Sequence, residues 1–215
     1  MRKRMKDIAY EKIQEMILNG QLGPSEMINE YSLAAELNIS RTPVREALTK
    51  LENEGYVHAF PNKGVMVATL DADDIVKISE VREALEGFAV RLACDRMDPE
   101  VAMDLKRKLE AIPNLEEEEY QEKSFMLGRQ LHNQILKSTG NELLMKYVLN
   151  ITAQLNRIML LSRYAPSRAQ TTFDEHMLIV DAILSKDKDL AEQSMRNHII
   201  SVANDVINLK KMDYV

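Results

Sequence analysis

Hydrophobic positions recur along most of this chain with the period of an α-helix. Between residues 5 and 19 they return every three or four positions, and Gly20 follows at once, which predicts an amphipathic helix that ends there. Asn29 is suited to cap a second, shorter helix that runs to Leu37. This stretch is therefore predicted to hold two helices joined by the loop QLGPS.

A third helical pattern begins in the stretch SRTPVREAL. Ser40 favours an N-cap, Pro43 falls in the first turn, where its missing N–H does no harm, and Gly55 suits the end of the helix. The apolar stripe of this helix consists of Val44, Ala47, Leu48 and Leu51.

The opposite face of this third helix is polar and positively charged. Arg41, Arg45 and Thr49 are four residues apart and share that face, with Thr42 beside them at the helix start. Two guanidinium groups and two hydroxyls therefore point away from the core, which indicates a partner outside the protein. The alternative is an ordinary solvent-exposed helix face.

Two β-prone runs, YVHAF and VMVAT, follow this helix and are separated by PNKG, which predicts a hairpin. A helix, a helix–turn–helix and a hairpin, in that order, form a winged helix–turn–helix module over residues 1–70. Beyond it the strand patterns stop and helical patterns continue, with breaks that contain proline, glycine or capping residues. The predicted fold is thus mainly α, and residues 71–215 form an antiparallel all-α bundle of about six helices: 73–96, 99–111, 116–138, 141–164, 168–185 and 187–210.

Charge is distributed unevenly between these two parts. The net charge is −6, yet residues 1–70 hold nine basic and nine acidic residues, so the excess of acid belongs to the helical part. Any contact with DNA must therefore be made by a local patch. A secretory signal and a run of membrane-spanning length are both missing from the pattern, which predicts a cytoplasmic protein without a membrane partner. The single Cys94 rules out a disulfide framework and is expected to be buried.

Three of the four histidines fall on apolar helix faces. His132, His176 and His198 lie on three different predicted helices and all point inward, whereas His58 lies in the first strand of the hairpin. A single inward histidine is usually a core residue hydrogen-bonded to a neighbour. Three that converge can instead bind zinc or nickel, because imidazole is a favoured ligand of both ions. Both interpretations are open at this point.

Several motifs resemble one family of bacterial transcription regulators. The segment LAAELNISRTPVREALTKLENEGYV, followed by PNKG, is similar to the DNA-binding domain of the GntR family over most of residues 8–68. The pattern RxxLE in VREALEGFAVRLA, together with HNQILKSTGN, DEHMLIVDAI and MRNHI, resembles the effector domain of its FadR-type (FCD) branch. Six helices in place of seven suggest the VanR-like subgroup.

The resemblance implies that the third helix enters the major groove of DNA. Arg41 and Arg45 are then the candidates for contacts with guanine, since arginine can donate two hydrogen bonds to that base. Ser40 and Thr42 are expected to meet phosphate at the helix start, and the wing tip is expected to reach the DNA backbone or minor groove. The full set of candidate DNA-binding residues is Ser40, Arg41, Thr42, Arg45, Thr49, Lys63 and Gly64.

The resemblance also implies a pocket for a small carboxylate effector, commonly with a divalent metal held by an aspartate and three histidines. Gly128 stands where that aspartate is expected, one turn before His132, so the three histidines would need water or an effector carboxylate to complete the site. Arg82 lies on an inward face, where a guanidinium needs an anionic partner, either an internal carboxylate or the effector. Arg163 is a second candidate of this kind.

The sequence thus predicts a ligand-responsive transcription regulator, usually a repressor, that binds a palindromic operator as a homodimer. One alternative is a metal sensor, in which the ion itself is the signal. Another is a three-histidine hydrolase, which lacks an inward acid near the histidines in sequence and leaves the winged module unexplained, so we expect no enzyme. The stripe Leu144, Val148, Ile151, Leu155 and Ile158 could serve either dimerisation or the internal core.

Overall fold

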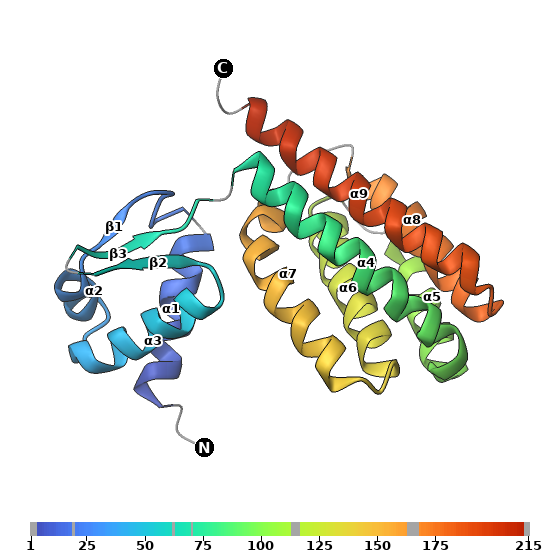
Figure 1. Cartoon of the computed structure of the whole chain (residues 1–215), viewed down its shortest axis with the longest axis horizontal. Coiled ribbons are helices and arrows are strands. Elements are labelled where there is room, and N and C mark those ends of the chain that lie inside the picture. The colour runs from blue at the N-terminus through green and yellow to red at the C-terminus, as the bar shows by residue number, and fades with distance from the viewer. Residues whose placement is uncertain are drawn as a thin grey trace. The chain divides into compact units, whose positions relative to one another are not determined.

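The computed structural model of the chain divides into two compact units, Met1–Asp71 and Ala72–Val215 (Figure 1). It describes residues 4–18, 20–61, 63–69, 71–112, 117–162 and 168–212. The predicted fold class is confirmed, because a small sheet accompanies helices in the first unit and helices alone form the described part of the second. Within the described residues, no helix is long and apolar enough to span a membrane.

The first unit has the element order of a winged helix–turn–helix. Its sheet is antiparallel with the order β1-β3-β2. The hairpin of β2 and β3 was predicted, but β1 was not, because a strand of two residues is too short to show an alternating pattern. The elements are α1 (Met5–Leu18), β1 (Met27–Ile28), α2 (Glu30–Glu36), α3 (Arg41–Asn53), β2 (Val57–Phe60) and β3 (Gly64–Val67).

The caps of α2 and α3 differ in chemistry. Asn29 caps α2 as predicted, since its side-chain oxygen accepts hydrogen bonds from the backbone N–H groups of Tyr31 at 2.9 Å and Ser32 at 3.2 Å. Ser40 stands at the N-cap of α3 with extended backbone, but its hydroxyl makes no capping hydrogen bond there. Its side chain is exposed. The predicted stripe of α3 is buried in the core that this helix shares with α1.

The second unit is built from six helices in its described part. Their boundaries lie within two residues of the predicted ones, and α4 packs along α9 (Figure 1). Cys94 is buried in the core, as expected. The helices are α4 (Ala72–Arg96), α5 (Pro99–Glu110), α6 (Glu117–Ser138), α7 (Glu142–Ser162), α8 (Arg168–Leu184) and α9 (Lys188–Met212).

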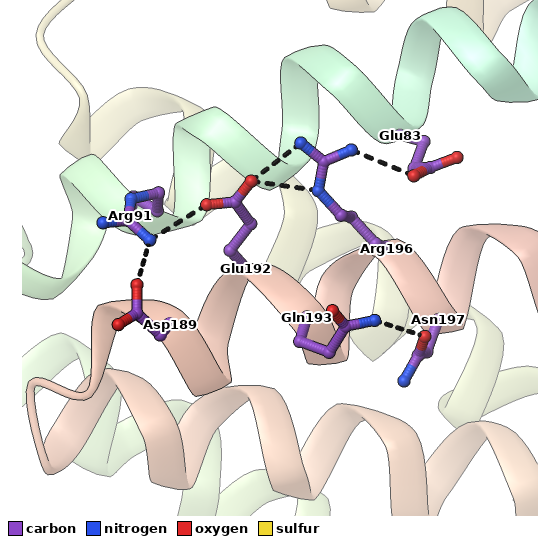
Figure 2. A network of polar contacts seen from close by, with 7 residues as sticks. All are labelled: Glu83, Arg91, Asp189, Glu192, Gln193, Arg196 and Asn197. Atoms are coloured by element: carbon purple, nitrogen blue, oxygen red, sulfur yellow. Dashed lines mark hydrogen bonds and ion pairs between the residues drawn. The ribbon is translucent and has the colours of Figure 1, made fainter.

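A network of ion pairs joins α4 to α9, which pack against each other. Figure 2 shows Glu192 of α9 between two arginines, with Arg196 at 2.7 Å and Arg91 at 3.0 Å. Arg196 also contacts Glu83 of α4 at 2.9 Å. A side chain at position 87 would bring its Cβ to 3.2 Å from Arg196 Cγ, so glycine allows this close approach. The network therefore fixes the register of two helices that both carry residues of the site described next.

Candidate functional site

The polar face of α3 carries the two arginines where the sequence predicts them. The side chain of Arg45 is 60% exposed and that of Arg41 is 36% exposed. Thr42 and Thr49 are exposed on the same helix, although the Thr49 hydroxyl donates a hydrogen bond to the Arg45 carbonyl at 3.0 Å. These side chains form one accessible surface, as expected of a helix that reads DNA.

Both arginines contact a carboxylate, Glu30, that the pattern of α3 alone does not reveal. Glu30 Oε2 accepts a hydrogen bond from Arg45 Nε at 2.6 Å and one from Arg41 Nη2 at 3.2 Å. Burial alone would raise the pKa of Glu30, but the two guanidinium groups outweigh it and hold that pKa below its usual value. The carboxylate is therefore ionised and paired at neutral pH.

The wing tip contains the two remaining candidates for DNA contact. Lys63 is exposed in the turn between β2 and β3, and its backbone N–H donates to the Phe60 carbonyl at 3.0 Å. Gly64 has a φ of +106°, a conformation that other residues rarely adopt. A Cβ at this position would also lie 3.1 Å from Met27 Cε, so the turn requires glycine. Lys63 is thus exposed next to a position that requires glycine.

The three inward histidines converge in the second unit. His132 of α6, His176 of α8 and His198 of α9 each offer a ring nitrogen, and these nitrogens lie within 4.8 Å of one another. His132 Nε2 and His198 Nε2 are 3.3 Å apart. His176 and His198 are buried. The convergence predicted from the helix faces is therefore present in the fold.

Two carboxylates orient His132 and His198. Glu86 Oε2 of α4 lies 2.5 Å from His132 Nδ1, and Glu175 Oε2 of α8 lies 2.7 Å from His198 Nδ1. An ionised carboxylate only accepts, so each Nδ1 donates to its carboxylate, and the Nε2 atoms of the two rings face each other in the cluster. The expectation that no inward acid accompanies the histidines in sequence was wrong, because Glu175 directly precedes His176 on α8 and contacts His198. Glu86 comes from a different helix, α4. Such carboxylate–histidine pairs are typical of metal ligands.

Arg82 has an internal partner. It is 3% exposed, and its Nε donates to Glu86 Oε1 at 2.7 Å. Burial would raise the pKa of Glu86, but the adjacent Arg82 and His132 hold it well below its usual value. Of the two partners considered for Arg82, the internal carboxylate is thus present, and Arg82 still lines the cavity beside the histidines. Arg163 lies outside the described residues.

The resulting chain of contacts crosses four helices. Arg82 contacts Glu86, Glu86 contacts His132, His132 Nε2 faces His198 Nε2, and His198 contacts Glu175. We refer to these five residues as the polar chain. It links α4, α6, α9 and α8 in that order, and all of its residues except Glu175 line a cavity of about 160 Å³.

Gly128 also lines the cavity and lies directly against His176. A Cβ at position 128 would lie only 2.5 Å from His176 Cε1. The space in which an aspartate would start is therefore filled by an imidazole ring. Position 128 cannot regain a carboxylate ligand unless His176 moves.

The three histidines nevertheless suit a divalent metal. Two nitrogen ligands that are each about 2.0–2.1 Å from a tetrahedral zinc ion lie about 3.3 Å apart. The two Nε2 atoms of His132 and His198 have this separation, 3.3 Å. The donor set therefore fits zinc or nickel, with His176 as the third nitrogen donor.

Comparisons with known proteins agree with these features. The FCD domain matches residues 77–201, and the family described as "Bacterial regulatory proteins, gntR family" matches residues 6–67. The chain is 31% identical to the uncharacterized HTH-type transcriptional regulator YdhC of Bacillus subtilis, with 88% of this chain and 85% of the relative covered. It is 22% identical to the HTH-type transcriptional repressor RspR of Escherichia coli, over 94% of this chain and 89% of the relative.

The fold also matches a solved structure described as E. coli McbR/YncC, with a TM-score of 0.74 and 20% identity over the whole of both chains. The matched families and relatives are transcription regulators, which agrees with the prediction that the chain is not an enzyme. Assignment to the VanR-like subgroup stays a prediction. The chain belongs to the GntR family of bacterial transcription regulators and to the branch that carries an FCD domain.

Proposed function

We propose that this regulator is a repressor that reads its operator through Arg41 and Arg45 of α3. The observation that carries the proposal is the pair of arginines on the exposed face of a helix that follows a helix–turn and precedes a wing. In such a module the helix lies in the major groove, where a guanidinium can donate two hydrogen bonds to guanine. Exposed Ser40, Thr42 and Lys63 are suited to phosphate contacts. The name of the relative RspR supports repression.

This proposal is tested by selecting the preferred DNA sequence of the wild type and of two variants. Arg41→Ala and Arg45→Ala should each cost about 1–3 kcal/mol of binding free energy and relax the preference at one base pair. Arg107→Ala removes the same charge from an exposed site in the second unit and should leave the preference unchanged. An unaltered preference in both α3 variants would refute the base contacts.

In the second unit we propose a pocket for a small carboxylate effector, with a divalent metal at the three histidines. The cavity of about 160 Å³ is smaller than the roughly 300–1,000 Å³ of pockets for drug-sized ligands, which favours a small metabolite. A bound zinc or nickel ion would supply positive charge for the effector carboxylate. Glu86 and Glu175 hold the imidazoles of His132 and His198 in the orientation that such an ion needs.

The competing proposal is a metal sensor, and one titration separates the two. Operator affinity is measured with metal-free protein, with zinc or nickel alone, and with metal plus a panel of small carboxylic acids. If the acid is the signal, metal alone leaves the affinity unchanged and an acid shifts it. A full response to metal alone would favour the sensor and remove the need for an organic effector.

We further propose that the protein binds a palindromic operator as a homodimer, since a two-fold protein matches a two-fold site. The surface suited to the contact lies on α4 and α7, which pack together and expose large apolar side chains. Val81 and Phe88 of α4 are 45% and 52% exposed, and Leu143 and Tyr147 of α7 are 62% and 55% exposed. Phe88→Glu should therefore shift the sedimentation coefficient from dimer to monomer. A dimer of unchanged stability would exclude this surface.

The apolar stripe of α7, predicted to serve either dimerisation or the internal core, belongs at least in part to the core. Leu144 and Val148 are 8% and 2% exposed, whereas Ile151 is half-buried. The side chains of Leu155 and Ile158 lie outside the described residues. The dimer proposal therefore rests on the exposed side chains of α4 and α7, which the stripe does not include.

A further inference from the structure

We propose that Glu30 is a positioning residue for DNA recognition, which holds Arg41 and Arg45 in one fixed arrangement. The inference rests on the proposed reading of DNA by these two arginines. Glu30, a residue of α2 that is negatively charged like DNA, would thus contribute to the sequence specificity of DNA binding.

Glu30 is itself well placed to act as an anchor. It is the first residue of α2, directly after the cap formed by Asn29, and its side chain is 23% exposed. One oxygen, Oε2, accepts from both arginines, from Arg45 at 2.6 Å and from Arg41 at 3.2 Å. Because the two guanidinium groups share one acceptor atom, the position of each is coupled to that of the other.

Tyr31, the next residue of α2, constrains Arg41 further. The guanidinium carbon of Arg41 lies 3.6 Å above the centroid of the Tyr31 ring, a cation–π contact. The tyrosine is 66% exposed, so the stacked pair is part of the accessible surface. Arg41 is thus held by a ring and a carboxylate from adjacent residues, while Arg45 is held by the carboxylate.

These contacts leave the arginines free to bind a base. A guanidinium has five N–H donors, and Glu30 takes a single one from each arginine. For Arg45 the engaged donor is Nε, so both terminal nitrogens remain for the two acceptors of a guanine. Holding long side chains in place before binding also reduces the conformational entropy lost on binding.

The charge of Glu30 acts in a second way. Non-specific affinity for DNA grows with the number of cations that neutralise phosphates, and a carboxylate 2.6 Å from Arg45 opposes this. The first 70 residues hold equal numbers of acidic and basic residues, so the module has no excess of positive charge that would hold it on any sequence. Glu30 therefore weakens binding to random-sequence DNA, where the arginines contact only phosphates, and preserves binding to the operator, where they contact bases.

Two variants of Glu30 separate position from charge. Glu30→Asp keeps the charge but shortens the side chain, so it should leave affinity for random-sequence DNA unchanged and lower affinity for the selected operator about 10-fold. Glu30→Gln removes the charge, so it should raise affinity for random DNA and make its salt dependence steeper, again with a loss of preference. Glu36→Gln makes the same charge change at the other end of α2, away from the arginines.

The measurement is the ratio of operator affinity to random-DNA affinity, with the base preference determined for each variant. We expect both Glu30 variants to relax the preference at the two arginine-read base pairs together, while Glu36→Gln leaves the ratio within about 2-fold of wild type. The inference is overturned if either Glu30 variant keeps the wild-type ratio and preference although Arg41→Ala and Arg45→Ala change theirs. If the arginine variants also keep the wild-type preference, the proposed base contacts fail and this inference fails with them.

Discussion

Replacing Gly128 with alanine tests whether His176 is held where the structure shows it. The new Cβ would lie 2.5 Å from His176 Cε1, whereas ordinary contacts begin at 3.4 Å, so the ring or the helix has to move by about 1 Å. His176 is 2% exposed, and the open space beside it is the cavity that it lines. A ring that moves changes the distances from its nitrogens to those of the other two histidines, which line the same cavity.

The magnitude follows from two opposing effects. Overpacking of a buried site costs about 1–3 kcal/mol, while alanine in place of glycine inside a helix contributes about 1 kcal/mol of stability. Gly87→Ala is the matched control, because position 87 also lies inside a helix and its Cβ meets only flexible side chains, with Arg196 Cγ nearest at 3.2 Å. The Gly128 variant should therefore be less stable than the Gly87 variant by about 1–3 kcal/mol.

The assay is urea denaturation of both variants, followed by thermal melts with EDTA, zinc or nickel. In a chain of this size, each kcal/mol corresponds to a change of about 2–4 °C in melting temperature. Displacement of His176 should also weaken metal affinity about 10–100-fold, an effect comparable to the loss of a group that orients a ligand. If Gly128→Ala is as stable as Gly87→Ala and responds to metal like wild type, the ring is not held against Gly128 and the reasoning fails.

Two further predictions concern the same unit. His198→Ala should lose most of the rise in melting temperature that zinc or nickel produces, whereas His58→Ala, in exposed β2, should keep it; equal effects would contradict the assigned site. Glu192→Ala should lower the free energy of unfolding by about 1–2 kcal/mol, because it breaks two ion pairs. The control Gln193→Ala removes only a contact within α9, so it should change the free energy of unfolding by less than about 0.5 kcal/mol. Hydrogen bonds from Arg196 and Arg91 hold the pKa of Glu192 below its usual value. The ion pairs of Glu192 therefore add fully to the free energy of unfolding above about pH 4.3, and this addition is lost as the pH falls through the lower pKa of the folded state. If the free energies of unfolding of wild type and Glu192→Ala differ by the same amount down to about pH 3, this pH dependence is contradicted.

Long periodic segments made most of the fold predictable from the sequence. The six helices in the described part of the second unit were identified within two residues, because each has a sustained apolar face and ends at proline, glycine or a capping residue. β1 could not be identified, since two residues carry no period. Ser40 was identified as an N-cap by residue type, but whether its hydroxyl bonds to the helix depends on a rotamer that residue type does not determine.

A candidate residue was predictable where the apolar pattern of its own helix sets the direction of its side chain. The inward faces of His132, His176 and His198 follow from periodicity alone, whereas their carboxylate partners come from other helices or from across the cluster. Glu86 lies one turn after Arg82 on the same inward face, and this spacing could have revealed it. Contacts between helices, such as that of Glu30 with α3, depend on how the helices cross.

The polar chain lines the cavity, through all of its residues except Glu175, and at the same time connects the helices of the bundle. Because its five side chains connect four helices, a molecule that binds at its centre also braces the helices against one another. Any such molecule that binds only the folded protein stabilises it, by about 2.7 kcal/mol at a concentration of 100 times its Kd. Thermal stability can therefore be used as a screen: a library of small acids, tested with and without metal, would identify ligands of the proposed pocket before any operator is known.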